Sequence, residues 1–105
     1  MLDWLNADNW TKGATARDFE MNEVACTSHA AEYFDLFGAV YISKNWNSVD
    51  EFYSKVDELK KIYKLIQPNK HEQASKLEGG ATLPNLNDML DNFGQVKQII
   101  TMLEL

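Results

Sequence analysis

The chain has 105 residues, and its sixteen acidic and ten basic side chains give a net charge of −6. Its 45% apolar and 25% charged residues are typical of a folded domain rather than of a disordered chain, and the length predicts a single domain over residues 1–105. The acidic balance argues against nucleic acid or an anionic membrane as a direct partner, because both repel negative charge.

The single cysteine cannot form an intramolecular disulfide, which favours a reducing, cytoplasmic environment. The opening MLDWLNADNW has no basic segment and carries Asp3, so it does not resemble a signal peptide. The apolar run at residues 36–43 is far shorter than the roughly 20 residues of a membrane span. These features predict a cytoplasmic protein that does not cross a membrane.

Residues 1–14 carry two tryptophans, Trp4 and Trp10, and we expect a short, loosely docked helix there. The two rings are six residues apart, so one helix would not place them on the same face. Tryptophan is enriched at binding hot spots, which makes Trp4 and Trp10 candidate partner-binding residues. The alternative is that both rings cover the open end of a small helical bundle.

The next element is expected to be a helix over residues 16–43. Thr15 followed by Asp18 offers an N-terminal cap, and apolar residues recur at helical spacing after it. These residues are Cys26, Ala30, Tyr33, Phe37 and Val40. The stretch AVYIS at residues 39–43 also fits a short strand. We prefer a helix there, because no convincing partner strand is found elsewhere in the sequence.

Residues 49–66 carry the clearest helical pattern. Apolar residues at steps of three and four form one ridge: Val49, Phe52, Val56, Leu59, Tyr63 and Ile66. Ser48 and Glu51 have the spacing of a capping box at the start, and Pro68 ends the helix because it disfavours helical geometry at Gln67. A short, lightly docked helix is expected at residues 70–78.

Residues 86–104 repeat this arrangement. A second apolar ridge has the same spacing: Leu86, Met89, Phe93, Val96, Ile100 and Leu103. Asn85 is the expected N-cap, and Gly94 is the one residue that disfavours the helix. The sequence therefore predicts an all-α fold, a small bundle of three main helices with one or two short ones.

Cys26 and His29 raise the question of cysteine chemistry, because three residues separate neighbours on one helix face. A cysteine nucleophile needs a base and a group that orients that base, and no local signature of such an enzyme surrounds Cys26. We interpret the pair as a buried thiol beside a boundary imidazole. No cofactor is expected, because EGGAT at residues 78–82 lacks the features of a phosphate loop.

A metal site is not expected either, because the chain has one cysteine, two histidines and no ligand spacing such as CxxC or HExxH. The acidic residues Asp50, Asp57 and Glu58 lie in a line on the helix at 49–66 and are candidate partner-binding residues. A solvated face with ion pairs explains the same line without a partner.

These observations favour a non-catalytic protein-binding module: a small acidic adapter or inhibitor whose partner is another protein. Its size and acidity suit a phage-encoded or mobile-element protein. The alternative is a structural subunit of a helical or virion-type assembly, in which residues 49–66 and 86–104 mediate self-association. An enzyme that uses Cys26 is the third hypothesis.

Overall fold

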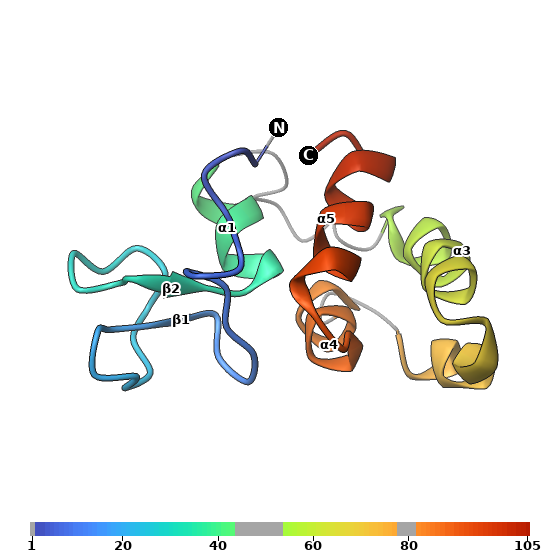
Figure 1. Cartoon of the computed structure of the whole chain (residues 1–105), viewed down its shortest axis with the longest axis horizontal. Helices are drawn as coiled ribbons and strands as arrows, with labels where there is room; N and C mark the ends of the chain where they lie inside the picture. Colours follow the sequence, from blue (N-terminus) through green and yellow to red (C-terminus); the bar gives the residue numbers. More distant parts are fainter. Residues whose placement is uncertain (1, 44–53, 78–81) are drawn as a thin grey trace.

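The computed structural model describes residues 2–43, 54–77 and 82–105. Its elements in these ranges are β1 (Ala16–Arg17), β2 (Tyr33–Phe34), α1 (Leu36–Ile42), α3 (Val56–Ile66), the 3-10 helix η1 (Pro68–Lys76), α4 (Thr82–Met89) and α5 (Phe93–Met102). The strands lie at one end of the long axis and α3 with η1 at the other, with α1, α4 and α5 between them (Figure 1).

The prediction of a mostly helical protein is confirmed, but the long helix expected at residues 16–43 is wrong. Only its last part is helical, as α1, and this part includes residues 39–42 of the ambiguous stretch at residues 39–43. Residues 16–17 instead pair antiparallel with residues 33–34. This small sheet and the loops around it replace the first of the three long helices that the sequence predicted.

The helix fails at its expected start because Asp18 bonds elsewhere. The Asp18 carboxylate accepts hydrogen bonds from the backbone N–H groups of Glu20 (3.0 Å) and Asn22 (2.9 Å), which closes a turn instead of capping a helix. The N-cap of α1 is Asp35, whose Oδ1 accepts from the N–H of Gly38 at 2.6 Å.

The N-terminal helix expected within residues 1–14 is also wrong for the described residues, which form turns. Asn6 and Asn9 hold these turns through side-chain bonds to nearby backbone groups, the alternative to a helix that asparagine favours. Leu2 and Leu5 are nevertheless buried in the core of the protein.

The helix predicted at residues 49–66 is confirmed over its described part, as α3. Leu59 and Tyr63 of the ridge are buried, and the helix ends at Ile66 before Pro68, as expected. Val49, Asp50, Phe52 and the capping pair Ser48 and Glu51 lie outside the described residues. The short helix expected at residues 70–78 is present as η1, which begins directly after α3.

The single helix predicted at residues 86–104 is wrong, because it is two helices, α4 and α5. The side chain of Asn92 caps α5 by accepting from the N–H of Gln95 at 3.1 Å. Asn85 is therefore inside α4 rather than at its N-cap. Gly94 falls in the first turn of α5, where a helix tolerates glycine better than in its interior.

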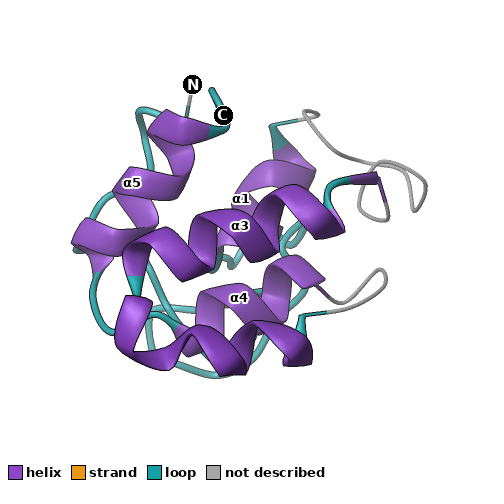
Figure 2. Cartoon of the chain, turned by 90° about the vertical axis from the view of Figure 1, so that its right-hand side faces the viewer, coloured by secondary structure: helices purple, strands orange, loops and turns teal. Residues whose placement is uncertain are grey.

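The core lies between these helices. α3 packs against α4 and α5, and α4 also packs against α1 (Figure 2). Both ridges contribute to this core, so they face each other within one chain. The described helices include none with the length and hydropathy needed to cross a bilayer.

Candidate functional site

Cys26 and His29 do not form a catalytic pair on a helix face, because the segment that holds them is not helical. Cys26 is half-buried and His29 is exposed. Burial raises the pKa of the Cys26 thiol, and the charge of Asp35 raises it further. A raised pKa lowers the thiolate fraction, which is the opposite of what a nucleophile requires.

The two candidate tryptophans occupy different environments. The ring of Trp4 is exposed on one side and meets Phe34 edge-on, with 5.1 Å between the ring centroids. Trp10 is half-buried, packs against Phe93 at 6.1 Å and donates from Nε1 to the Asn87 side chain at 2.6 Å. Trp10 is thus bound into the interior by its polar atom as well as by its ring.

Asn87 connects three parts of the chain from a fully buried position. Its Oδ1 accepts from Trp10 Nε1 and from the N–H of Leu36 at 3.0 Å. Its Nδ2 donates to the carbonyl oxygen of Thr11 at 3.0 Å. A single amide on α4 therefore fixes the N-terminal segment and the start of α1.

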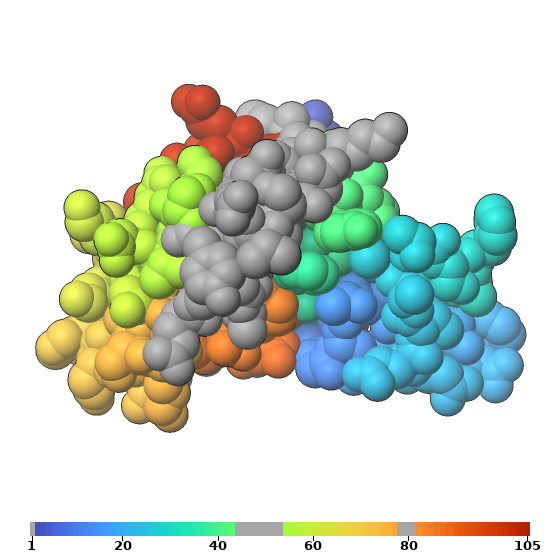
Figure 3. Space-filling view, turned by 180° about the vertical axis from the view of Figure 1, so that it is seen from behind, coloured from blue at the N-terminus to red at the C-terminus, as the bar shows by residue number. Residues whose placement is uncertain are grey.

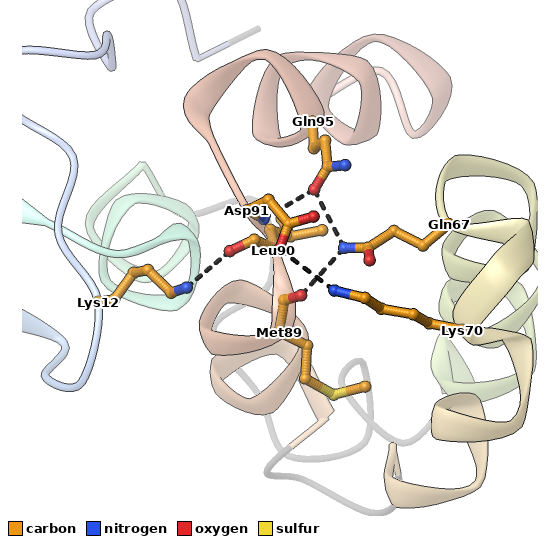
Figure 4. A network of polar contacts seen from close by, with 7 residues as sticks. All are labelled: Lys12, Gln67, Lys70, Met89, Leu90, Asp91 and Gln95. Carbon is orange, nitrogen blue, oxygen red and sulfur yellow. Dashed lines mark hydrogen bonds and ion pairs between the residues drawn. The ribbon is translucent and has the colours of Figure 1, made fainter.

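Other side chains bind the junction between α4 and α5 (Figure 4). Gln67, which is buried, donates to the carbonyl oxygen of Met89 at 3.0 Å and to Gln95 Oε1 at 3.1 Å. Lys12 donates to the carbonyl oxygen of Leu90 at 2.6 Å. These donors satisfy carbonyl groups that the end of α4 leaves without helical partners.

The outer side of this junction is more exposed. The same Gln95 oxygen accepts from the N–H of Asp91 at 2.8 Å, and Lys70 lies 3.6 Å from the Asp91 carboxylate. The lysine and the carboxylate are both more than half exposed, so this ion pair contributes little to stability. The network in Figure 4 is therefore structural: it holds the helix junction in place.

A cavity of about 510 Å³ lies between the loop at residues 13–15, the segment at residues 23–25 and α4. Three carboxyl side chains line it: Glu23, Asp35 and Asp88. Asp35 is only 2% exposed, and this burial, together with the charge of Asp88, raises its pKa to about 7. The N–H of Gly38 partly offsets the rise by stabilising the carboxylate.

A second feature is the turn at residues 18–22, which we call the tip. It exposes two apolar side chains: Phe19 is 73% exposed and Met21 is 47% exposed. Its backbone is closed by two bonds of 2.9 Å, one from the N–H of Met21 to the Asp18 carbonyl and one from the N–H of Asp18 to the Asn22 carbonyl. Phe19 is therefore presented to solvent on a closed turn.

Arg17 holds the tip to the rest of the molecule. Its guanidinium donates to the hydroxyl of Thr11, to the carbonyl oxygen of Lys12 and to that of Met21, each at 3.1 Å. The Met21 backbone has a φ of +69°, which is uncommon for a residue with a side chain. The bond from Arg17 to the Met21 carbonyl helps to hold this conformation.

Most of the N-terminal region, residues 2–35, forms one end of the molecule (Figure 3), and this region carries the tip and much of the cavity lining. It contains seven of the sixteen acidic residues but only two of the ten basic ones, Lys12 and Arg17. The net charge of this region is −5, out of −6 for the whole chain. The net negative charge of the protein is thus concentrated in the N-terminal region.

The acidic candidates from the sequence do not join this region. Asp57 and Glu58 are exposed in the first turn of α3, at the other end of the molecule (Figure 1), and Glu58 pairs with Lys55 at 3.6 Å. Asp50 lies outside the described residues. Within the described ranges, no three histidine, cysteine or acidic side chains gather closely enough to hold a metal ion.

The comparisons with known proteins return no match: none of the family models, curated proteins or solved structures resembles this chain. The tip was missed at the sequence level because Phe19 was assigned to a helix. Two features of the sequence indicate that the tip is polar and acidic, although neither predicts the turn itself. Phe19 is flanked by Asp18 and Glu20, and the first 35 residues hold almost all of the net charge.

Proposed function

We propose that this protein is a non-catalytic protein-binding module, a small acidic adapter or inhibitor that docks on another protein through the tip. The observation that carries this proposal is the 73% exposure of Phe19 on a turn closed by its own hydrogen bonds. A large exposed aromatic ring on a fixed backbone can be buried by a partner with little loss of conformational entropy.

The environment of Cys26 supports binding over cysteine catalysis. Its thiol has a raised pKa, and His29 lies in an exposed, non-helical segment rather than beside it on a helix. Asp35, which lines the cavity beside Val24 and Ala25, disfavours a thiolate at Cys26 further. Replacing Cys26 by serine should therefore leave partner binding unchanged.

Self-association as an assembly subunit is the second candidate function. It is favoured by two exposed apolar side chains, Leu65 on α3 and Met102 on α5. Most of the described residues of the ridges at 49–66 and 86–104 that suggested it pack inside the chain, so these outer side chains would have to form the interface. Light scattering at micromolar concentration separates the candidates, because an assembly subunit should associate without any partner.

The direct test of docking compares two variants in affinity capture from cells that produce the protein. Phe19→Ser removes the exposed ring of the tip, and Leu65→Ser removes an equally exposed apolar side chain (69%) at the other end of the molecule. We expect a partner to be recovered with the wild type and with Leu65→Ser but lost with Phe19→Ser. Equal recovery with Phe19→Ser would refute docking through the tip, provided that both variants melt like the wild type.

A further inference from the structure

We infer that the partner presents a basic surface around an apolar pocket, and that Phe19 enters this pocket while the acidic N-terminal region faces the basic rim. This inference rests on the proposed function and adds the chemistry of the partner. Its basis is the position of an exposed aromatic side chain within a region whose net charge is −5.

The charges of this region are not neutralised from within. In the described part of the chain, none of its seven acidic residues lies in an ion pair with a lysine or arginine. Both of its basic residues donate to other groups: Lys12 to the carbonyl of Leu90, and Arg17 to Thr11 and two backbone carbonyls. Lys12 and Arg17 therefore offset only two of the seven formal negative charges of the region.

The environment of Asp35 also favours a basic partner over an acidic one. Burial is the main cause of its raised pKa, and the charge of Asp88, which lines the same cavity, adds a smaller repulsion. A partner with acidic side chains would increase this repulsion, whereas a basic partner would relieve it. Charge complementarity thus selects a basic protein surface over an acidic or neutral one.

The rest of the molecule does not share this strong negative charge. Residues 36–105 carry nine acidic and eight basic residues, for a net charge of −1. The exposed Leu65 lies on α3, which has three lysines at positions 60, 61 and 64. Three exposed large apolar residues of the described segments, Trp4, Phe19 and Met21, lie in the acidic N-terminal region, and Phe19 is the most exposed of them.

The probe for this inference is a synthetic peptide of alternating arginine and leucine, with a copy that has glutamate in place of each arginine. Binding to the full-length ¹⁵N-labelled protein is followed by amide chemical shifts. We expect the basic peptide to shift amide signals of the N-terminal region, residues 2–35, and the acidic copy to shift none. Raising the salt from about 0.1 M to about 1 M shortens the Debye length from about 10 Å to about 3 Å, so affinity should fall at least about tenfold.

Two triple variants with the same net charge separate a local effect from a global one. Glu20, Glu23 and Glu32→Gln remove three exposed charges near the tip, and Asp57→Asn, Glu72→Gln and Glu104→Gln remove three elsewhere. We expect the first triple to weaken peptide binding about tenfold and the second less than about twofold. Phe19→Ser should weaken it at least about threefold, because the ring adds apolar contact.

Equal effects of the two triples, equal binding of the acidic peptide, or no effect of Phe19→Ser would each overturn the inference. Failure of the proposed function is a separate result: in that case the captured cellular partner would not depend on Phe19. If that partner depends on Phe19 but its capture is unaffected by salt and by the first triple, the proposed function stands and the basic partner is refuted.

Discussion

At the scale of single residues, Asn87 carries the strongest polar connection between the N-terminal region and the helices. Replacing it by alanine leaves the Trp10 Nε1–H, the Leu36 N–H and the Thr11 carbonyl without their bonds to it. We expect the free energy of unfolding to fall by about 3 kcal/mol or more, because each unsatisfied buried group costs about 1–3 kcal/mol. Urea denaturation measures this loss.

Asn85 provides the matched control, because it is an exposed asparagine on the same helix. Its replacement by alanine should change the free energy of unfolding by less than about 0.5 kcal/mol. Similar losses at both positions would contradict the structural role of Asn87.

Asp35 predicts a pH dependence of stability. Its folded pKa of about 7 lies above the ordinary value of 3.8, so the protonated form is favoured in the folded protein. Its stabilising contribution is complete below about pH 4 and is lost as the pH rises through about 7. Burial is the main cause of this raised pKa and the charge of Asp88 adds to it, whereas the N–H groups of Gly38 and Phe37 lower it.

Asp35→Asn tests this prediction, because asparagine can keep the N-cap bond to Gly38 without the charge. We expect the variant to be more stable than the wild type by about 2–4 kcal/mol at about pH 8 and nearly equal at about pH 4. Thermal melts across this range should show the two stability curves diverging with pH. Parallel curves would show that Asp35 is ionised normally.

At the scale of elements, α5 ends in a Schellman motif. The N–H of Leu105 bonds to the carbonyl of Ile100 at 2.9 Å, and the N–H of Glu104 bonds to the carbonyl of Thr101 at 3.3 Å. Glu104 occupies the left-handed position of this motif with a φ of +56°. Glycine is the residue that this position favours, because it has no Cβ to strain the backbone.

Glu104→Gly should therefore raise the free energy of unfolding by about 0.5–1 kcal/mol, as measured by urea denaturation. The opposite change is available at Gly13, which has a φ of +80°. Gly13→Ala should lower the stability by a similar amount, about 1 kcal/mol. A loss of stability in Glu104→Gly would mean that α5 does not end in this motif.

The elements also show which features the sequence can predict. The described residues of both ridges, apart from Val56, lie in the core or against it, because helical spacing reports burial directly. The break between α4 and α5 has a local signal in Asn92, which caps α5, but the uninterrupted spacing of the second ridge concealed it. The helix expected at residues 16–43 failed because local bonds to Asp18 compete with helix formation.

Much of the candidate site depends on contacts between distant residues. The bonds from Asn87 to Thr11 and from Lys12 to Leu90 join positions more than 70 residues apart, so sequence spacing cannot predict them. The acidic charge of the N-terminal region, in contrast, can be counted from the sequence. The exposure of Phe19 was missed, because the helical assignment gave this side chain a different environment and outweighed the signal of its acidic neighbours.

At the scale of the whole molecule, the helical core and the proposed binding surface occupy different parts of the structure. The helices bury the described apolar ridges, while the N-terminal region is fixed to them by Asn87 and Lys12 and presents the tip (Figure 1). This division means that changes to the tip should alter binding with little effect on the core. Phe19→Ser should accordingly keep the melting temperature of the wild type.

The most direct measurement of the central claim is site-specific photo-crosslinking in cells that produce the protein. A benzophenone amino acid replaces Phe19 in one variant and Leu65 in another, two exposed apolar positions at opposite ends of the molecule. We expect a single crosslinked partner from position 19, attached through a basic surface, and no such product from position 65. The same product from both positions, or none from position 19, would contradict it.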